Sequence, residues 1–140
     1  MTATRTVVFV CAHGAAKSVI AAEYFRRLAT ERGLGVDATS AGTDPDPEIP
    51  PKVVAGLLDD GLDVRGHRPR RVTWEDLSSA SHVVSFGCEL EEIAPPGLPV
   101  ERWDDIPAVS EDFTAARNLI VARLPRLLAR WEGSPESAAG

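Results

Sequence analysis

A cysteine, a loop of small residues and a cation stand close together near the beginning of the chain. Cys11 directly follows the apolar run 7–10, and Lys17 and Ser18 come six and seven residues after it. Backbone N–H groups and a nearby cation stabilise a thiolate, which is the nucleophilic form of cysteine. A cysteine at the end of an apolar strand is otherwise an inert core residue. Together with the loop and the cation, the spacing favours thiol chemistry on an anionic substrate.

The flanking segments predict how these residues are positioned. The run 6–10 is mostly β-branched, as in a strand buried on both faces of a parallel sheet. Beyond the loop, apolar residues recur with helical period and predict a helix over about 17–32, ended by Gly33 and Gly35. Ligands of strand–loop–helix units bind over the first turn of the helix, where free N–H groups favour anions. The residues expected to bind the substrate are Ala12, His13, Gly14, Ala15 and Ala16.

The rest of the chain alternates between strand and helix signals. Strands are expected over 36–43, 82–88 and 100–103. A helix should begin at Pro50 or Pro51 and stop at Gly61, and a short one should follow a cap at Thr73. Ser110 is expected to cap a last helix that runs to Trp131 and is kinked at Pro125. This alternation predicts a single α/β domain with a parallel sheet. Residues 133–140 are expected to form a disordered tail.

Composition narrows the function classes. The chain has 140 residues, 44% of them apolar, and a formal net charge of −6, which argues against nucleic acid as a partner. No apolar run is long enough to span a membrane, and no signal peptide is evident. The two cysteines, Cys11 and Cys88, form neither a disulfide framework nor a metal-ligand set. We therefore expect a cytoplasmic protein without a metal or other bound cofactor.

One short segment departs from the acidic balance of the chain. It concentrates five basic side chains, Arg65, His67, Arg68, Arg70 and Arg71. Two interpretations are open at this stage: a solvated loop, or a surface that lines the approach of an anionic substrate.

The cysteine loop resembles the signature of the low-molecular-weight protein tyrosine phosphatases and their arsenate reductase relatives. Members carry Arg where this chain has Lys17, and often a left-handed Asn where it has Gly14, a residue that adopts that conformation at little cost. Ser40-Ala41-Gly42-Thr43 is similar to the segment after the family's second strand. The resemblance covers about 5–131. It implies a low-molecular-weight-phosphatase-like domain over 1–132, with a four-stranded parallel sheet in the order 2-1-3-4 flanked by helices.

The resemblance also implies catalytic roles. Cys11 would be the nucleophile, Lys17 would bind oxyanion oxygens, and the Ser18 hydroxyl would hydrogen-bond the thiolate. Family members protonate the leaving group with an Asp before a Pro on the loop after the fourth strand, which favours Asp105 here and leaves Asp104 in reserve. Ala108 and Val109 stand where the family carries aromatic residues that grip phosphotyrosine. The expected substrate is therefore a small oxyanion or a small phosphoester.

Three function classes stay open. The first is a cysteine-dependent oxyanion enzyme, either a phosphatase-like hydrolase or an arsenate-reductase-like oxidoreductase. Reductases of the family relay a disulfide through cysteines near the end of the third strand. Cys88 falls there, but the further cysteine is missing, so a reductase would use Cys88 alone or an external thiol reductant. The second class is a catalytically weak oxyanion-binding module, and the third is a redox protein that uses Cys11 and Cys88.

Overall fold

The structure is a computed structural model that describes residues 5–90 and 92–131, so the expected tail at 133–140 lies outside the described residues. Its elements, in chain order, are β1 (Arg5–Cys11), α1 (Lys17–Glu31), β2 (Val36–Gly42), α2 (Pro51–Asp59), α3 (Trp74–Ser79), β3 (His82–Ser85), β4 (Glu101–Arg102) and α4 (Phe113–Leu128). The four strands pair in parallel in the order β2-β1-β3-β4. The predicted α/β domain and its strand order are confirmed.

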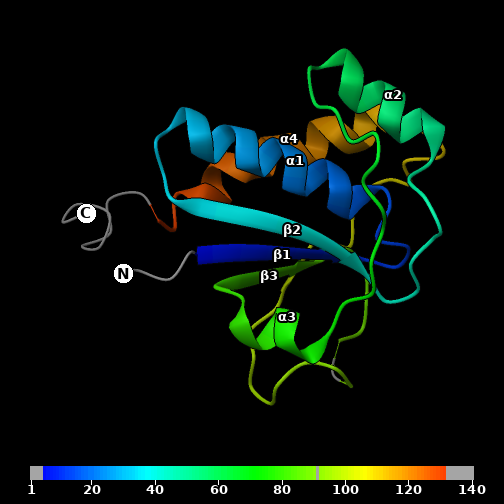
Figure 1. Ribbon diagram of the computed structural model, residues 1–140. Coiled ribbons are helices and arrows are strands. Elements are labelled where there is room, and N and C mark those ends of the chain that lie inside the picture. Colours follow the sequence, from blue (N-terminus) through cyan, green and yellow to red (C-terminus); the bar gives the residue numbers. More distant parts are fainter. Residues whose placement is uncertain (1–4, 91, 132–140) are drawn as a thin grey trace.

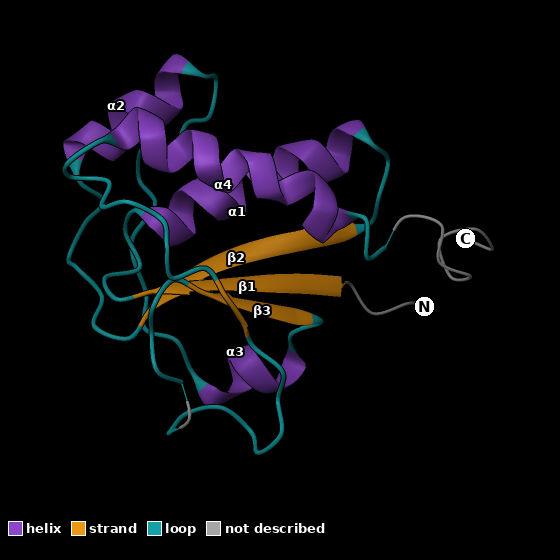
Figure 2. Cartoon of the chain, turned by 180° about the vertical axis from the view of Figure 1, so that it is seen from behind, coloured by secondary structure: helices purple, strands orange, loops and turns teal. Residues whose placement is uncertain are grey.

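Helices cover both faces of the sheet. Helices α1, α2 and α4 lie on one face and α3 lies on the other (Figures 1 and 2). Alternate residues of β1 follow this division: Val7 and Phe9 pack in the core under α1 and α4, whereas Val8 and Val10 pack in the core that includes Leu77 of α3. Because both faces are buried, β1 needs apolar side chains at successive positions.

The carboxyl ends of the strands meet at one edge of the sheet, where the loops after β1 and β2 contact each other. Cys11 at the end of β1 lies opposite Gly42 at the end of β2. The amide groups of Thr43, Asp44 and Asp46 donate to the carbonyls of Cys11, Ala12 and His13, respectively. The segment after β2 is thereby fastened along the loop after β1.

Several predicted boundaries are wrong. Helix α4 ends at Leu128 and not at Trp131. The last helix is capped by Asp112, whose carboxylate accepts from the Ala115 amide, and not by Ser110. Strand β3 ends at Ser85, because the Ser85 hydroxyl bonds both the amide and the carbonyl of Cys88 and Gly87 turns the chain with φ +82°. Strand β4 spans only Glu101–Arg102. The helix α4 does continue through Pro125.

The basic segment 65–71 forms a loop that reaches the carboxyl end of β2 and is held by ion pairs and hydrogen bonds. Arg65 pairs with Asp63, Arg70 pairs with Asp76, and Arg71 donates to the carbonyl of Thr43. The backbone around Arg71 also forms a bridge to Gly42. These side chains are engaged in structural contacts, which favours the first of the two interpretations of the cluster. No helix of the described residues is long and apolar enough to cross a membrane.

Candidate active site

The loop between β1 and α1 is held in shape by two glycines from different elements. Gly14 has φ +59°, the left-handed conformation expected of it. A Cβ on Gly14 would lie 2.7 Å from the Gly42 nitrogen, and a Cβ on Gly42 would lie 2.6 Å from the Gly14 nitrogen. Both distances are too short for a side chain. The Gly of Ser40-Ala41-Gly42-Thr43 therefore lets the end of β2 approach the loop.

Most amide groups of the loop have no described hydrogen-bond acceptor within the protein. Its carbonyls at 11–13 accept from the segment 43–46, whereas no described hydrogen bond uses the amides of residues 13–18. Helix α1 begins at Lys17 without a side-chain cap. Free N–H groups at a helix N-terminus attract anions, and the helix dipole adds to this preference. The loop is thus built to receive an oxyanion.

Cys11 and Ser18 meet beneath this loop. The Cys11 Sγ lies 3.1 Å from the Ser18 Oγ, and both residues are buried. When Cys11 is a thiolate, the Ser18 hydroxyl is the donor and the sulfur is the acceptor. A buried hydroxyl needs a partner, and this contact supplies one to Ser18.

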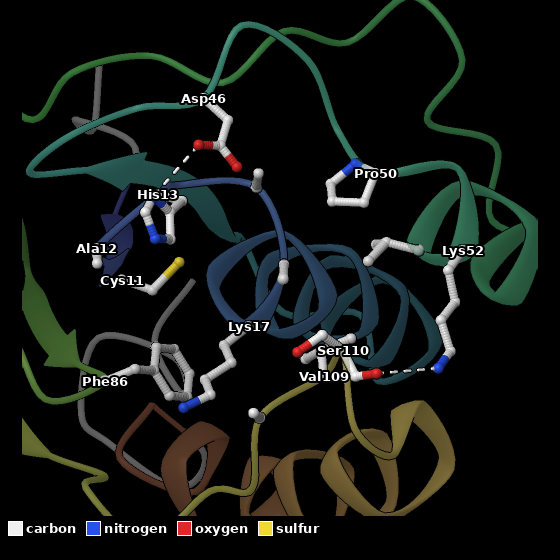
Figure 3. Close-up of a pocket in the computed structure, with 14 residues that line it drawn as sticks. Cys11, Ala12, His13, Lys17, Asp46, Pro50, Lys52, Phe86, Val109 and Ser110 are labelled. Carbon is white, nitrogen blue, oxygen red and sulfur yellow. Dashed lines mark hydrogen bonds and ion pairs between the residues drawn. The ribbon is translucent and has the colours of Figure 1, made fainter.

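Cys11 also faces a cavity of about 470 Å³. The walls are largely apolar, and polar groups converge on them from several elements (Figure 3). The lining residues are Cys11, Ala12, His13, Ala15, Ala16, Lys17, Asp46, Pro50, Lys52, Val53, Phe86, Ala108, Val109 and Ser110. A cavity of this size and character is typical of a small-molecule site.

The structure thus brings together most of the site residues predicted from the sequence. Cys11, Ala12, His13, Ala15, Ala16 and Lys17 line the cavity, Ser18 supports Cys11, and Gly14 shapes the loop. The ammonium of Lys17 has no partner among the described residues. Both lysines of the chain, Lys17 and Lys52, line this one cavity, although the chain has thirteen arginines.

Asp104 and Asp105 are not brought to the cavity. The Asp105 carboxylate binds Arg123 of α4 through two hydrogen bonds of 2.9 and 2.5 Å. These bonds hold the pKa of Asp105 below its ordinary value, which keeps the carboxylate ionised. Asp104 accepts from the Arg102 Nε at 3.0 Å. The loop after β4 instead presents Ala108, Val109 and Ser110 to the cavity.

Cys88 lies on the other side of the sheet from Cys11. Cys88 packs with Val8 and Val10 in the α3-side core, whereas Cys11 belongs to the core under α1 and α4. Burial raises the pKa of the Cys88 thiol, and the nearby Cys11 raises it further. Both cysteines are free in this structure. Cys88 does not line the cavity of Cys11.

Sequence reasoning missed one polar contact in the cavity. The His13 Nδ1 lies 3.2 Å from the Asp46 Oδ1, and both side chains are partly exposed. The sequence predicts His13 only as part of the substrate-binding loop and assigns no role to Asp46. The sole signal in the sequence is the position of Asp46, shortly after the strand expected over 36–43.

The sequence was compared with known families and proteins. A family model described as "Low molecular weight phosphotyrosine protein phosphatase" matches residues 6–101. The chain belongs to this family. The match includes the cysteine loop, β2 and the end of β3, so the predicted resemblance is confirmed.

Individual relatives agree with this assignment. A protein of Halobacterium salinarum that carries the provisional name arsenate reductase is 28% identical over 97 residues, which is 68% of each chain. The crystal structure of YfkJ from Bacillus subtilis has a TM-score of 0.82 at 23% identity and covers 92% of this chain and 95% of its own. A low molecular weight phosphotyrosine phosphatase from Vibrio cholerae O395 has a TM-score of 0.79 at 20% identity, covering 92% and 97%. These two structures share the fold of this family member.

No group of three or more His, Cys, Asp or Glu side chains suited to a metal ion occurs within 5–90 and 92–131. Membership of the family supports a cysteine-based enzyme that acts on an oxyanion.

Proposed function

We propose that the protein is a cysteine-dependent phosphomonoesterase for a small organic phosphoester. The observation that carries the proposal is the position of the Cys11 sulfur, 3.1 Å from the Ser18 hydroxyl, beneath a loop of free amides. The amides of 13–18 and the Lys17 ammonium would bind the non-bridging oxygens of the phosphate. Such donors stabilise the charge that develops in the transition state.

The reaction has two steps. The Cys11 thiolate attacks phosphorus, the S–P bond forms and the P–O bond to the alcohol breaks. Water then attacks the phosphocysteine, the S–P bond breaks, and inorganic phosphate leaves with regeneration of the thiolate. The proton that the alcohol gains and the proton that water loses are exchanged with a group of the protein.

The shape of the cavity supports an organic ester over a bare oxyanion. A tetrahedral anion held by the loop fills only a small part of about 470 Å³. Pro50, Val53 and Phe86 then offer apolar walls to the alcohol portion of the ester. Ala108 and Val109 supply no aromatic grip on a phosphotyrosine ring, so we propose small esters as substrates.

Arsenate reduction is the second candidate, and two observations favour it. The Halobacterium relative carries that name, and Cys11 contributes to raising the pKa of the Cys88 thiol. In this reaction arsenate(V) gains two electrons and becomes arsenite, while Cys11 forms a disulfide with Cys88 or with an external thiol. The external reductant then restores the thiols. The proposal requires no bound cofactor, and its partner is the small oxyanion or phosphoester alone.

Turnover of two substrates separates the candidates. We expect Cys11-dependent release of phosphate from p-nitrophenyl phosphate, with loss of activity in Cys11→Ser and an unchanged rate in Cys88→Ser. Arsenite formation from arsenate with dithiothreitol that exceeds the phosphatase rate would favour reduction. Phosphate binding without turnover of either substrate would instead support an oxyanion-binding module.

Lys17→Arg tests how the loop cation acts. A guanidinium holds two oxygens at once through its planar fork, whereas an ammonium is a point charge with rotatable donors. If Lys17 is a weaker substitute for Arg, Lys17→Arg raises kcat for p-nitrophenyl phosphate. We expect the opposite, a loss of activity, because both lysines of the chain line this cavity and no arginine of the described residues does. A rise in kcat would contradict this expectation.

A further inference from the structure

Expulsion of a poor leaving group, such as an ordinary alcohol, from a phosphoester is assisted by a proton donor beside the scissile bond. Among the described residues, the loop after β4 contributes only Ala108, Val109 and Ser110 to the cavity. Its two carboxylates are engaged elsewhere, Asp105 with Arg123 and Asp104 with Arg102. The loop that carries the expected acid therefore leaves the cavity without a carboxylic acid.

The segment after β2 supplies a carboxylate instead. Asp46 lines the cavity, and its Oδ1 lies 3.2 Å from the Nδ1 of His13, which follows Cys11 by two residues. The backbone reinforces this contact, because the Asp46 amide donates to the His13 carbonyl at 3.0 Å. Figure 3 shows the His13 ring with one nitrogen paired with the Asp46 carboxylate and the other nitrogen pointing away from Asp46.

We infer that His13, oriented by Asp46, exchanges the protons of the reaction at this site. The inference rests on the proposed phosphomonoesterase function. The acid–base group is then a residue of the cysteine loop, supported by the segment after β2, and not a residue of the loop after β4. His13 is the catalytic residue, and Asp46 is a positioning residue that acts through it.

The chemistry follows from the two ring nitrogens. Protonated His13 donates its Nδ1–H to Asp46 and its Nε2–H to the leaving oxygen as the P–O bond breaks. Neutral His13 then accepts a proton from the water that attacks the phosphocysteine, and returns to its first state. A carboxylate on the far nitrogen fixes the orientation of the ring and the tautomer that it presents to the substrate, as in other His–Asp pairs.

The leaving group distinguishes this role from a structural one. A poor leaving group such as phenol needs a proton in the transition state, whereas p-nitrophenol departs with little help. We expect His13→Gln and Asp46→Asn each to lower kcat for phenyl phosphate by on the order of 10²-fold. The same variants should lower kcat for p-nitrophenyl phosphate only slightly. Asp46→Glu, which keeps a carboxylate, should recover part of the lost rate.

Matched controls lie outside the cavity. His67→Gln removes another imidazole, and Asp63→Asn removes another ion-paired carboxylate; neither residue lines the cavity. Both variants should match the wild type on the two esters. Circular dichroism and phosphate binding check that each variant is folded with its loop intact.

Three outcomes overturn the inference. The first is equal loss on both esters in His13→Gln, which indicates damage to the loop. The second is an unchanged rate on phenyl phosphate in His13→Gln and Asp46→Asn. The third is the selective loss in Asp105→Asn or Asp104→Asn instead. In each of these cases Cys11-dependent turnover of the wild type leaves the proposed function standing, whereas wild-type protein that hydrolyses neither ester overturns both.

Discussion

The two cysteines show how position alone separates residues of one type. Cys11 faces the cavity and contacts Ser18 in the first turn of α1, where the helix dipole favours an anion. Both cysteines are buried, but Cys88 packs in the core that includes Leu77 of α3 and does not line the cavity. Burial and the neighbouring Cys11 raise the pKa of the Cys88 thiol, so its thiolate forms only at a pH above the ordinary range.

We therefore predict selective alkylation. At pH 7 iodoacetamide should modify Cys11 faster than Cys88 by on the order of tenfold or more, because the thiolate is the reactive form. Mass spectrometry of timed digests measures both rates in one sample, and inorganic phosphate should protect Cys11 alone. Cys11→Ser provides the control, since it isolates the Cys88 rate. Equal labelling of the two thiols would contradict the assignment of Cys11 as the nucleophile.

At the scale of the element, the loop depends on a close approach of two backbones. Gly14 and Gly42 each occupy the space that the other's Cβ would need. We predict that Gly42→Ala lowers the free energy of unfolding by about 1–3 kcal/mol, a typical cost of overpacking. It should also weaken phosphate binding, because the loop must move to admit the methyl group.

Other glycines offer controls for this prediction. A Cβ on Gly35 meets nothing within 4 Å, so Gly35→Ala should preserve both stability and binding. Gly33 has φ +66°, and a Cβ there also meets nothing within 4 Å. Gly33→Ala therefore measures the cost of backbone strain alone, whereas Gly14→Ala would combine that strain with a steric clash. Urea unfolding and phosphate titration measure the two effects. Unchanged phosphate binding in Gly42→Ala would show that β2 does not support the loop.

The same scale shows what sequence reasoning can and cannot reach. Strands such as β1 and helices such as α1 were predictable because the spacing of apolar residues that identifies each of them lies within the element itself. Ser110 was chosen as a cap because its residue type suits one, but Asp112 meets the Ala115 amide and Ser110 does not. Only the tertiary structure decides between two such neighbours.

The candidate site, too, was only partly predictable from the sequence. Cys11, Lys17 and Ser18 form one local motif, so their gathering around one loop was predictable from the family resemblance. The contact between His13 and Asp46 depends on β2 lying beside β1, and the contact of Asp105 with Arg123 depends on where α4 packs. Neither contact has a signal in the spacing of residues along the chain.

For the whole molecule, acidic side chains both set the net charge of −6 and hold elements together. Tyr24 and Arg27 of α1 bind Asp60 after α2, Arg123 of α4 binds Asp105, and Arg70 binds Asp76 of α3. In each case hydrogen bonds lower the pKa of the carboxyl, outweighing the effect of burial where the group is buried. We propose that the site attracts anions through local amides and lysines, against the net charge of the molecule as a whole.

Glu101 provides the sharpest test of this arrangement, because it joins the two strands farthest from β2. Its carboxylate accepts from the Trp103 Nε1 at 2.6 Å and lies 2.8 Å from the His82 Nε2 of β3. Burial alone would raise the pKa of Glu101, but these hydrogen bonds prevail and lower it below its ordinary value of 4.5. A carboxyl with a lowered pKa in the folded state stabilises the protein above its ordinary pKa, and this contribution is lost as the pH falls below it.

We predict that Glu101→Gln lowers the free energy of unfolding by about 1 kcal/mol at pH 7, the scale of a charged hydrogen bond that is partly exposed to water. The difference from the wild type should shrink as the pH falls from 5 to 3, because the wild-type carboxylate then becomes protonated as well. Urea unfolding at pH 7, 5, 4 and 3 measures both trends. Glu31→Gln, at an exposed carboxylate near the end of α1, is the control and should change little at any pH. A Glu101→Gln deficit that stayed constant from pH 7 to 3 would show that packing, and not the charge of Glu101, links β4 to β3.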